Sequence, residues 1–165
     1  MTCLISRVAH AEIYAMATTI PTGFRALPLS IAQLSLAAVL KCGQSFRWMA
    51  LPLASSAHSD VTNLNVEYRL ALKDRVICLR QTPETLFYRA VFPTVSTGCS
   101  TNMADLERMR DAETLLWLQD YFQLEVDLVK LYDTWADTDS VFGNLRGRFS
   151  GIRILRQDPW ECLVS

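Results

Sequence analysis

Residues 64–72 read LNVEYRLAL, and the pattern of this run decides the fold class. Its apolar side chains alternate with the others, so that one set comprises Leu64, Val66, Tyr68 and Leu70 and the other Asn65, Glu67, Arg69 and Ala71. A period of two is typical of a strand that packs one face on a core and turns the other to solvent. The run therefore predicts a half-buried β-strand.

Two further β-rich runs follow this strand. A turn at Lys73 and Asp74 leads into RVICLR (residues 75–80), and Pro83 marks a second turn before TLFYRAVF (residues 85–92). Strand-like runs separated by short turn segments are typical of antiparallel hairpins. We expect the three runs to form an antiparallel meander.

A fourth strand is predicted upstream of the meander. The run QSFRWMAL (residues 44–51) contains Phe46 and Trp48 two positions apart, which places both rings on one face of a strand.

After residue 100 the apolar period changes to that of helices. Asn102 is a candidate cap for a helix carrying Leu106, Met109, Leu115, Leu118 and Phe122. Asp127 precedes Leu128, Leu131, Tyr132 and Trp135, and Asp139 precedes Val141, Phe142, Leu145 and Phe149. We interpret these stripes as core faces. Strands followed by helices predict an α+β domain with a small antiparallel sheet followed by packed helices.

The last residues carry strong helix-start signals. Asp158 is a good N-cap, Pro159 suits the first helical position, and Glu161 stands three residues after the Asp. Isolated helices need roughly 12–15 residues to be even marginally stable. Because the chain ends at Ser165, we expect its C-terminal helix to be truncated and the chain to be a piece of a longer protein.

Composition excludes several classes of protein. The 165 residues suit one domain, and the formal net charge of −1 does not fit a polybasic binder. The five cysteines include no CxxC pair, and the two histidines, His10 and His58, lie far apart, so we expect no metal and no cofactor. No run reaches the 18 or so apolar residues of a membrane-spanning helix.

Charge is nevertheless distributed unevenly. Residues 105–139 contain ten acidic residues, whereas residues 141–157 contain no acid and four arginines, namely Arg146, Arg148, Arg153 and Arg156. A basic stretch of this kind is either an ordinary solvated surface or an edge that faces phosphates. The composition leaves both readings open.

Three segments, in this order, resemble the N-terminal domain of eukaryotic 8-oxoguanine DNA glycosylases: CGQSFRW (residues 42–48), DYFQLEVDLVKLYDTW (residues 120–135) and GIRILRQDPWECL (residues 151–163). The resemblance assigns residues 25–165 to this domain and leaves residues 1–24 as a variable head. It implies a sheet that resembles half of a TATA-binding-protein fold. It also implies a following helix-hairpin-helix domain, absent here, that carries the catalytic Lys and an assisting Asp.

The resemblance also implies roles for single residues. Gly43 takes the place of a glycine whose backbone carbonyl contacts the oxidised base, and Phe46 lies nearby, where it either lines the same pocket or packs in the core. Without the motif, Gly43 reads as an ordinary turn glycine. Arg153 and Arg156 are candidates for the DNA-facing edge, with a structural role as the alternative. No catalytic residue is assigned, since Lys41, Lys73 and Lys130 match none of the family's catalytic positions.

The resemblance favours one function over two others. We expect the chain to bind double-stranded DNA containing oxidised guanine as part of a base-excision-repair enzyme, in the nucleus and, as a second compartment, the mitochondrion. The parent would hydrolyse the N-glycosidic bond and act as an abasic-site lyase, whereas this chain alone would be inactive. The alternatives are a stand-alone protein-interaction module that uses the acidic helices, and a small-molecule-binding domain with Gly43, Phe46 and Trp48 as pocket candidates.

Overall fold

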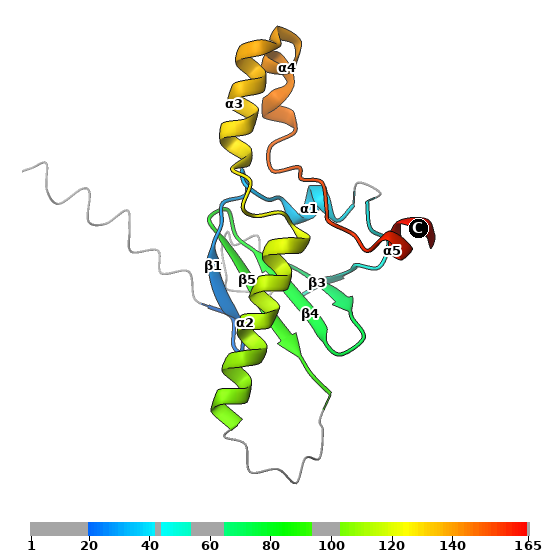
Figure 1. Cartoon of the computed structure of the whole chain (residues 1–165). Helices are drawn as coiled ribbons and strands as arrows, with labels where there is room; N and C mark the ends of the chain where they lie inside the picture. Colours follow the sequence, from blue (N-terminus) through cyan, green and yellow to red (C-terminus); the bar gives the residue numbers. More distant parts are fainter. Residues whose placement is uncertain (1–19, 42–43, 54–64, 94–102, 165) are drawn as a thin grey trace, which may run out of the picture.

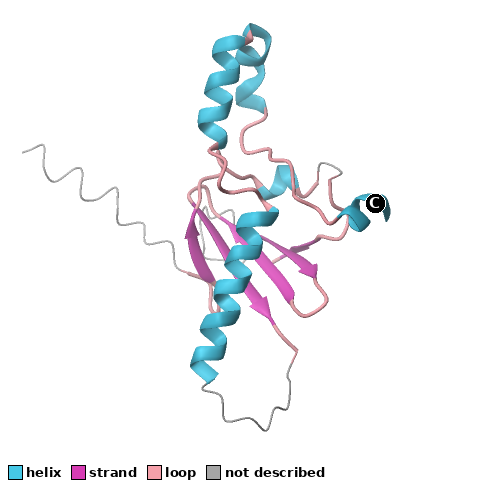
Figure 2. Cartoon of the chain, in the orientation of Figure 1, coloured by secondary structure: helices cyan, strands magenta, loops and turns pink. Residues whose placement is uncertain are grey.

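A computed structural model describes residues 20–41, 44–53, 65–93 and 103–164. In chain order its elements are β1 (Arg25–Pro28), α1 (Leu36–Val39), β2 (Met49–Pro52), β3 (Val66–Ala71), β4 (Val76–Gln81), β5 (Thr85–Val91), α2 (Met103–Tyr121), α3 (Leu128–Thr138), α4 (Ser140–Leu145), the 3-10 turn η1 (Arg146–Arg148) and α5 (Pro159–Val164). The α+β prediction is confirmed (Figures 1 and 2). Within these ranges no helix is both long and apolar enough to cross a membrane.

The sheet has five antiparallel strands in the order β1-β5-β4-β3-β2. Strands β3, β4 and β5 form the predicted meander, with Tyr68 opposite Leu79 and Leu79 opposite Tyr88. Strand β1 was not predicted from the sequence. It is a four-residue edge strand ending in Pro28, and such a short segment carries no visible alternation.

The strand predicted at residues 44–51 is wrong in its position. Strand β2 begins only at Met49, so Phe46 and Trp48 precede it. The two rings also do not share a face, because Trp48 is 9% exposed and Phe46 is 69% exposed. The alternation rule holds only within a strand, and this segment is not one.

One face of the sheet carries the core. Helix α2 crosses this face (Figure 1) and contributes Leu118 and Tyr121, with Phe122 directly after it. The sheet side chains that meet them, together with those of α1, are fully or almost fully buried: Leu36, Val39, Tyr68, Leu70, Ile77, Leu79, Leu86 and Tyr88. The prediction of a core face on α2 is confirmed at Leu118 and wrong at Met109, which is 62% exposed.

The opposite face of the sheet is charged around one buried acid. Glu67 is fully buried, and its carboxylate accepts hydrogen bonds from Arg69 Nε and from Arg80 Nε at 2.8 Å. Burial alone would raise the pKa of Glu67, but the bonds from Arg80 and Arg69 outweigh it and lower that pKa.

Helices α3 and α4 form a hairpin that projects away from the sheet (Figure 1). The predicted caps are confirmed: Asp127 accepts from Lys130 N at 3.1 Å, and Asp139 accepts from Val141 N at 2.7 Å. Asn102, the cap predicted for α2, lies outside the described residues.

The hairpin's apolar stripes were predicted as core faces, and this is wrong for most of their length. Leu128 alone among the residues of α3 and α4 is buried, whereas Trp135 is 44% exposed. Tyr132, Trp135 and Phe142 instead pack on one another, with ring centroids 5.5–5.7 Å apart. Two short helices that cover only each other cannot bury a whole aromatic stripe.

Helix α5 begins where the sequence predicts. Pro159 is its first residue, and Asp158 Oδ1 accepts from Trp160 N at 2.8 Å. The aromatic ring of Trp160 remains largely exposed, at 67%.

Candidate functional site

Gln44 joins two segments that are far apart in the sequence. Its side-chain Nε2 donates to the carbonyl of Arg153 at 2.7 Å, and its Oε1 accepts from the backbone N–H of Leu155 at 2.9 Å. A side-chain amide that bonds to one C=O and one N–H satisfies both backbone groups, as a neighbouring backbone segment would. The start of the segment 44–48 is thereby fixed against residues 153–155.

Trp48 joins the same segment to the end of α2. Its indole Nε1 donates to the hydroxyl of Tyr121 at 3.1 Å, and both side chains are buried. The Tyr121 ring stacks on Trp117 with centroids 4.6 Å apart and lies edge-on to Phe122 at 5.1 Å. The buried polar atoms of Trp48 and Tyr121 thus satisfy each other inside an aromatic cluster.

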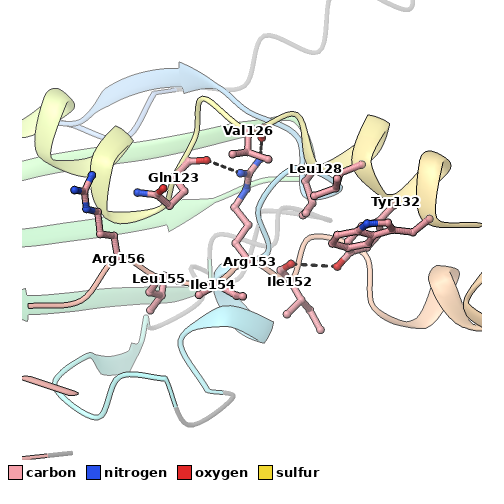
Figure 3. Close-up of a pocket in the computed structure, with 11 residues that line it drawn as sticks. Gln123, Val126, Leu128, Tyr132, Ile152, Arg153, Ile154, Leu155 and Arg156 are labelled. Carbon is pink, nitrogen blue, oxygen red and sulfur yellow. Dashed lines mark hydrogen bonds between the residues drawn. The ribbon is translucent and has the colours of Figure 1, made fainter. Parts of the chain in front are cut away.

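Arg153 is an interior residue that ties the connection between α2 and α3 to the loop before α1. It is 4% exposed, and its guanidinium donates to the carbonyls of Gln123 and Val126 (Figure 3). The guanidinium also donates to the carbonyl and to the side-chain Oε1 of Gln33. Burial lowers the pKa of Arg153. Because its guanidinium donates to protein oxygens inside the domain, Arg153 has a structural role and does not face DNA.

Gly151 determines how the segment 151–156 approaches the sheet layer. Its φ is +76°, and a Cβ built on it would lie 2.1 Å from the carbonyl oxygen of Ile31 and 2.8 Å from Ser35 N. The carbonyl of Gly151 accepts from Ser35 N at 2.8 Å. Only glycine permits both this backbone angle and this close contact.

Arg156 lies at the surface beside the junction of these segments. Its backbone N–H donates to the carbonyl of Tyr121 at 2.9 Å, and its guanidinium pairs with Asp120 at 2.6 Å. The Arg156 side chain is 66% exposed, so a phosphate could compete for it with the carboxylate of Asp120.

The other arginines of the basic stretch do not form one patch with Arg156. Arg146 pairs with Asp133 inside the hairpin, while Arg148 lies in the turn η1. The stretch read as a basic edge is therefore divided among the core, the hairpin and the surface.

Phe46 is exposed at 69%, which leaves its ring free to meet a ligand. Gly43 lies outside the described residues, and the nearest described residue of its motif is Gln44. Among the described residues, no group of His, Cys, Asp and Glu is placed to hold a metal ion.

An apolar groove of about 560 Å³ lies between α3 and the segment 152–156. Figure 3 shows its lining, which comprises Gln123, Val126, Leu128, Leu131, Tyr132, Trp135, Ile152, Arg153, Ile154, Leu155 and Arg156. The hydroxyl of Tyr132 lies 2.9 Å from the carbonyl oxygen of Phe149 and 3.1 Å from that of Ile152. Burial raises the pKa of Tyr132.

Sequence reasoning missed the residues that hold this site together. Gln33, Gln44 and Gly151 form its connections, and none was singled out for a role. A glutamine that pairs with backbone leaves no pattern in a single sequence. Gly151 opens the segment GIRILRQ, but only its backbone angle reveals why a glycine is needed there.

The three segments that carry the resemblance meet at this junction. Residues 42–48 contribute Gln44 and Trp48, residues 120–135 contribute Tyr121, and residues 151–163 contribute Arg153 and Leu155. A solved structure described as MBOgg1 in complex with a low-affinity DNA ligand shares the fold, with a TM-score of 0.53 and 24% identity over 87% of this chain and 39% of that one. The chain therefore has the α+β fold of that solved structure.

The family follows from the sequence comparison. The family described as 8-oxoguanine DNA glycosylase, N-terminal domain, matches residues 26–163, and the chain belongs to it. It is 32% identical over 143 residues to an N-glycosylase/DNA lyase of Saccharomyces cerevisiae, covering 86% of this chain and 33% of the yeast protein. It is 28% identical over 141 residues to N-glycosylase/DNA lyase OGG1 of Arabidopsis thaliana, covering 84% of this chain and 31% of that protein. The chain thus spans about a third of the length of these relatives.

Proposed function

We propose that this chain is the part of an 8-oxoguanine DNA glycosylase that helps to bind damaged DNA and to recognise oxidised guanine in base excision repair. The parent enzyme would hydrolyse the N-glycosidic bond and cleave the resulting abasic site. The observation that carries the proposal is the Gln44 connection, because it fastens the GQSFRW motif to the segment that leads into α5. The names of the yeast and Arabidopsis relatives support the class of activity.

The proposed recognition uses the carbonyl of Gly43. Oxidation at C8 converts N7 of guanine from an acceptor into an N–H donor, so a carbonyl accepts a hydrogen bond from the damaged base and faces a lone pair on the normal one. A flipped base must approach this carbonyl closely, and glycine has no Cβ to obstruct it. Because Gln44 is held by two hydrogen bonds, the residue that follows Gly43 has little freedom to move.

The test is Gly43→Ala in the full-length parent. One hydrogen bond contributes about 0.5–1.5 kcal/mol net and more when its loss leaves a buried group unpaired. Discrimination between 8-oxoguanine and guanine should therefore fall by roughly tenfold or more. Cleavage of a preformed abasic site, which needs no base in the pocket, should change less.

Gly147→Ala in the same parent is the matched control, because a Cβ there would meet nothing within 4 Å. If Gly43→Ala lowers base excision and abasic-site cleavage equally and also lowers the melting temperature, Gly43 is a structural turn and the recognition proposal fails.

The isolated 165-residue chain should have neither activity. Its three lysines, Lys41, Lys73 and Lys130, are all exposed, whereas an amine that forms a Schiff base is usually desolvated or placed beside another cation. Incubation with a duplex containing 8-oxoguanine, followed by borohydride, should trap no covalent adduct. An adduct that survives replacement of each lysine in turn would contradict this proposal too.

A protein-interaction module remains the second candidate, and the apolar groove beside α3 favours it. Trp135→Ala in the parent separates the two functions. If the groove serves a partner protein, this change leaves excision of 8-oxoguanine in the purified enzyme unaltered.

A further inference from the structure

The face of the sheet turned away from α2 carries one arginine on each of three neighbouring strands. Arg69 of β3 and Arg89 of β5 both lie opposite Cys78 of β4. Arg80 of β4 lies opposite Phe87 of β5. Residues directly opposite each other, and residues two apart on one strand, share a face. Cys78 and Phe87 pack outside the main core, so the three arginines lie on the face opposite α2.

This face has an excess of positive charge. Among the described strand residues, register and alternation place one acid on it, Glu67, which is fully buried and pairs with Arg69 and Arg80. Asp74 and Glu84 belong to the turns at opposite ends of β4. The carboxylate of Glu67 balances one of the three guanidiniums, and the face keeps a formal charge of +2.

Contacts within the face hold the guanidiniums in fixed orientations. The guanidinium carbons of Arg80 and Arg89 lie 4.8 and 4.9 Å from the centre of the Phe24 ring. The carboxylate of Glu67 accepts a hydrogen bond from Arg69 Nε and lies 2.6 Å from Arg80 Nη2. A guanidinium that stacks on a ring, or pairs along one edge, keeps donors on its other edge. Because these side chains are already ordered, less conformational entropy is lost when an anion binds them.

The arginines are also accessible to solvent. The side chain of Arg69 is 44% exposed, that of Arg80 is 23% exposed, and Arg89 is partly exposed. Cys78 and Phe87 beneath them are buried. Within the part of the chain that the structure describes, no carboxylate pairs with Arg89. The exposed part of this face is therefore cationic and attracts anions from solution.

We propose that this face binds the phosphate backbone of nucleic acid. A guanidinium matches a phosphate with two parallel N–H donors. Neighbouring strands lie about 4.8 Å apart, so the three arginines are spread over roughly 10 Å. A nucleic-acid strand carries one phosphate for about every 3.4 Å of helix axis, and a surface of this width faces several phosphates at once.

A second copy of this chain fits the face less well than nucleic acid does. The acids of the chain are concentrated in residues 105–139, but Asp111, Asp120 and Asp133 are each paired with an arginine of their own chain. Docking these acids on another copy exchanges one surface ion pair for another, which gains little free energy. A nucleic-acid phosphate exchanges only mobile counterions, and their release favours binding.

The face lies on the other side of the sheet from the junction that carries the proposed function. Trp48 and Tyr121, which join two motif segments at that junction, belong to the main core under α2. Binding of phosphates to the opposite face needs neither the Gly43 carbonyl nor a damaged base. It therefore goes beyond the proposed recognition of oxidised guanine.

The first experiment measures the affinity of the 165-residue chain for a short undamaged DNA duplex at several salt concentrations. Arg89→Gln should weaken binding about fivefold and reduce the slope of log affinity against log salt by about one, because it removes one phosphate contact. Arg89→Lys keeps the charge and should keep most of the slope. Arg108→Gln is the matched control, since Arg108 lies on α2, is 73% exposed and already pairs with Asp105. It should leave affinity and slope unchanged.

A second variant leaves every arginine contact in place. Met49 lies opposite Arg69 at the edge of the sheet and is 62% exposed, so Met49→Glu adds a negative charge to the face without removing a buried group. It should weaken duplex binding about as much as Arg89→Gln does. Met109 on α2 is equally exposed, and Met109→Glu should have no such effect because salt screens a charge on the other side of the sheet. Melting temperatures check that all variants are folded.

Three results would overturn the proposal: no duplex binding by the unaltered chain, equal weakening by Met49→Glu and Met109→Glu, or tighter binding of a polyglutamate peptide than of the duplex at matched salt. The last result would assign the face to an acidic protein partner. The outcome is independent of the Gly43→Ala test, which uses a damaged base. If the parent excises no 8-oxoguanine while duplex binding still depends on Arg89, the proposed function fails and the phosphate-binding face stands.

Discussion

Trp48 in the sheet layer and Trp135 in the α3–α4 hairpin are the centres of two aromatic clusters with different surroundings. Trp48 is 9% exposed and contacts Tyr121 and Phe122 between α2 and the sheet. Trp135 is 44% exposed and meets Tyr132 and Phe142 of its own hairpin. Trp48 is covered by the sheet on one side and by α2 on the other, whereas one side of Trp135 remains open to solvent. An aromatic stripe therefore indicates a packing face but not the depth of burial.

The first test of this comparison replaces two glycines, one that packs against the loop before α1 and one that follows the hairpin. Gly151→Ala should lower the free energy of unfolding by about 4 kcal/mol, because it combines a left-handed backbone angle with a close contact to the carbonyl of Ile31. Gly147→Ala, in the 3-10 turn η1 that follows α4, should change it by less than about 0.5 kcal/mol. Urea denaturation of both variants measures the difference, and equal effects would show that the hairpin packs as tightly as the junction.

A cavity in the sheet layer should have the next largest effect. Leu79 is fully buried on the core face, and Leu79→Ala should cost about 3 kcal/mol through lost transfer free energy and an unfilled space. The same denaturation measurement applies. A loss below about 1 kcal/mol would mean that the neighbours of Leu79 collapse into the space and that the sheet layer is more adaptable than its burial indicates.

The hairpin should tolerate a larger truncation better. Trp135→Ala should cost only about 1 kcal/mol, comparable with its aromatic contacts, because almost half of the side chain is already exposed. If this variant is less stable than Leu79→Ala, the two regions do not differ in the way proposed here.

The smallest effect concerns Asp127, which caps α3 where the hairpin leaves the domain. Hydrogen bonds from Gln33 and from the backbone of Lys130 lower the pKa of Asp127. A lowered folded-state pKa means that this contribution is complete above the ordinary Asp pKa and is lost as pH falls through the folded-state value. Asp127→Asn keeps a capping side chain but not its charge, so its melting temperature should be slightly lower than the original at pH 7 and should fall less on acidification to pH 3.

The parts of the fold predicted from sequence are those with a local cause. Alternation predicted β3, and β-rich runs between turns predicted β4 and β5. Side chains that bond within their own turn explain the predicted caps at Asp127, Asp139 and Asp158. The environments of Phe46 and Met109 were not predictable in this way, since exposure depends on whether a second layer covers them.

The candidate site was less accessible to sequence reasoning than the fold. Its motifs were recognised, and the structure brings them together at one junction. The connections themselves are side chain to backbone over long separations, as in Arg153 to Gln33 and in Gln81, which bonds to Leu34 O and Leu36 N. Such bonds depend on the finished fold, so the sequence alone does not distinguish the buried Arg153 from a surface cation.

The Gln44 connection also has a consequence for the order in which the molecule folds. Gln44 and Leu155 are 111 positions apart, whereas neighbouring strands of the meander are joined by short turns. A contact between distant positions requires a long loop to close, and the loss of chain entropy comes before the contact can stabilise the fold. This slows the formation of such contacts. We expect the meander to assemble early and the junction to close last. During synthesis, the strands of the sheet would therefore leave the ribosome before Arg153 and Leu155, the residues that bond to the Gln44 amide.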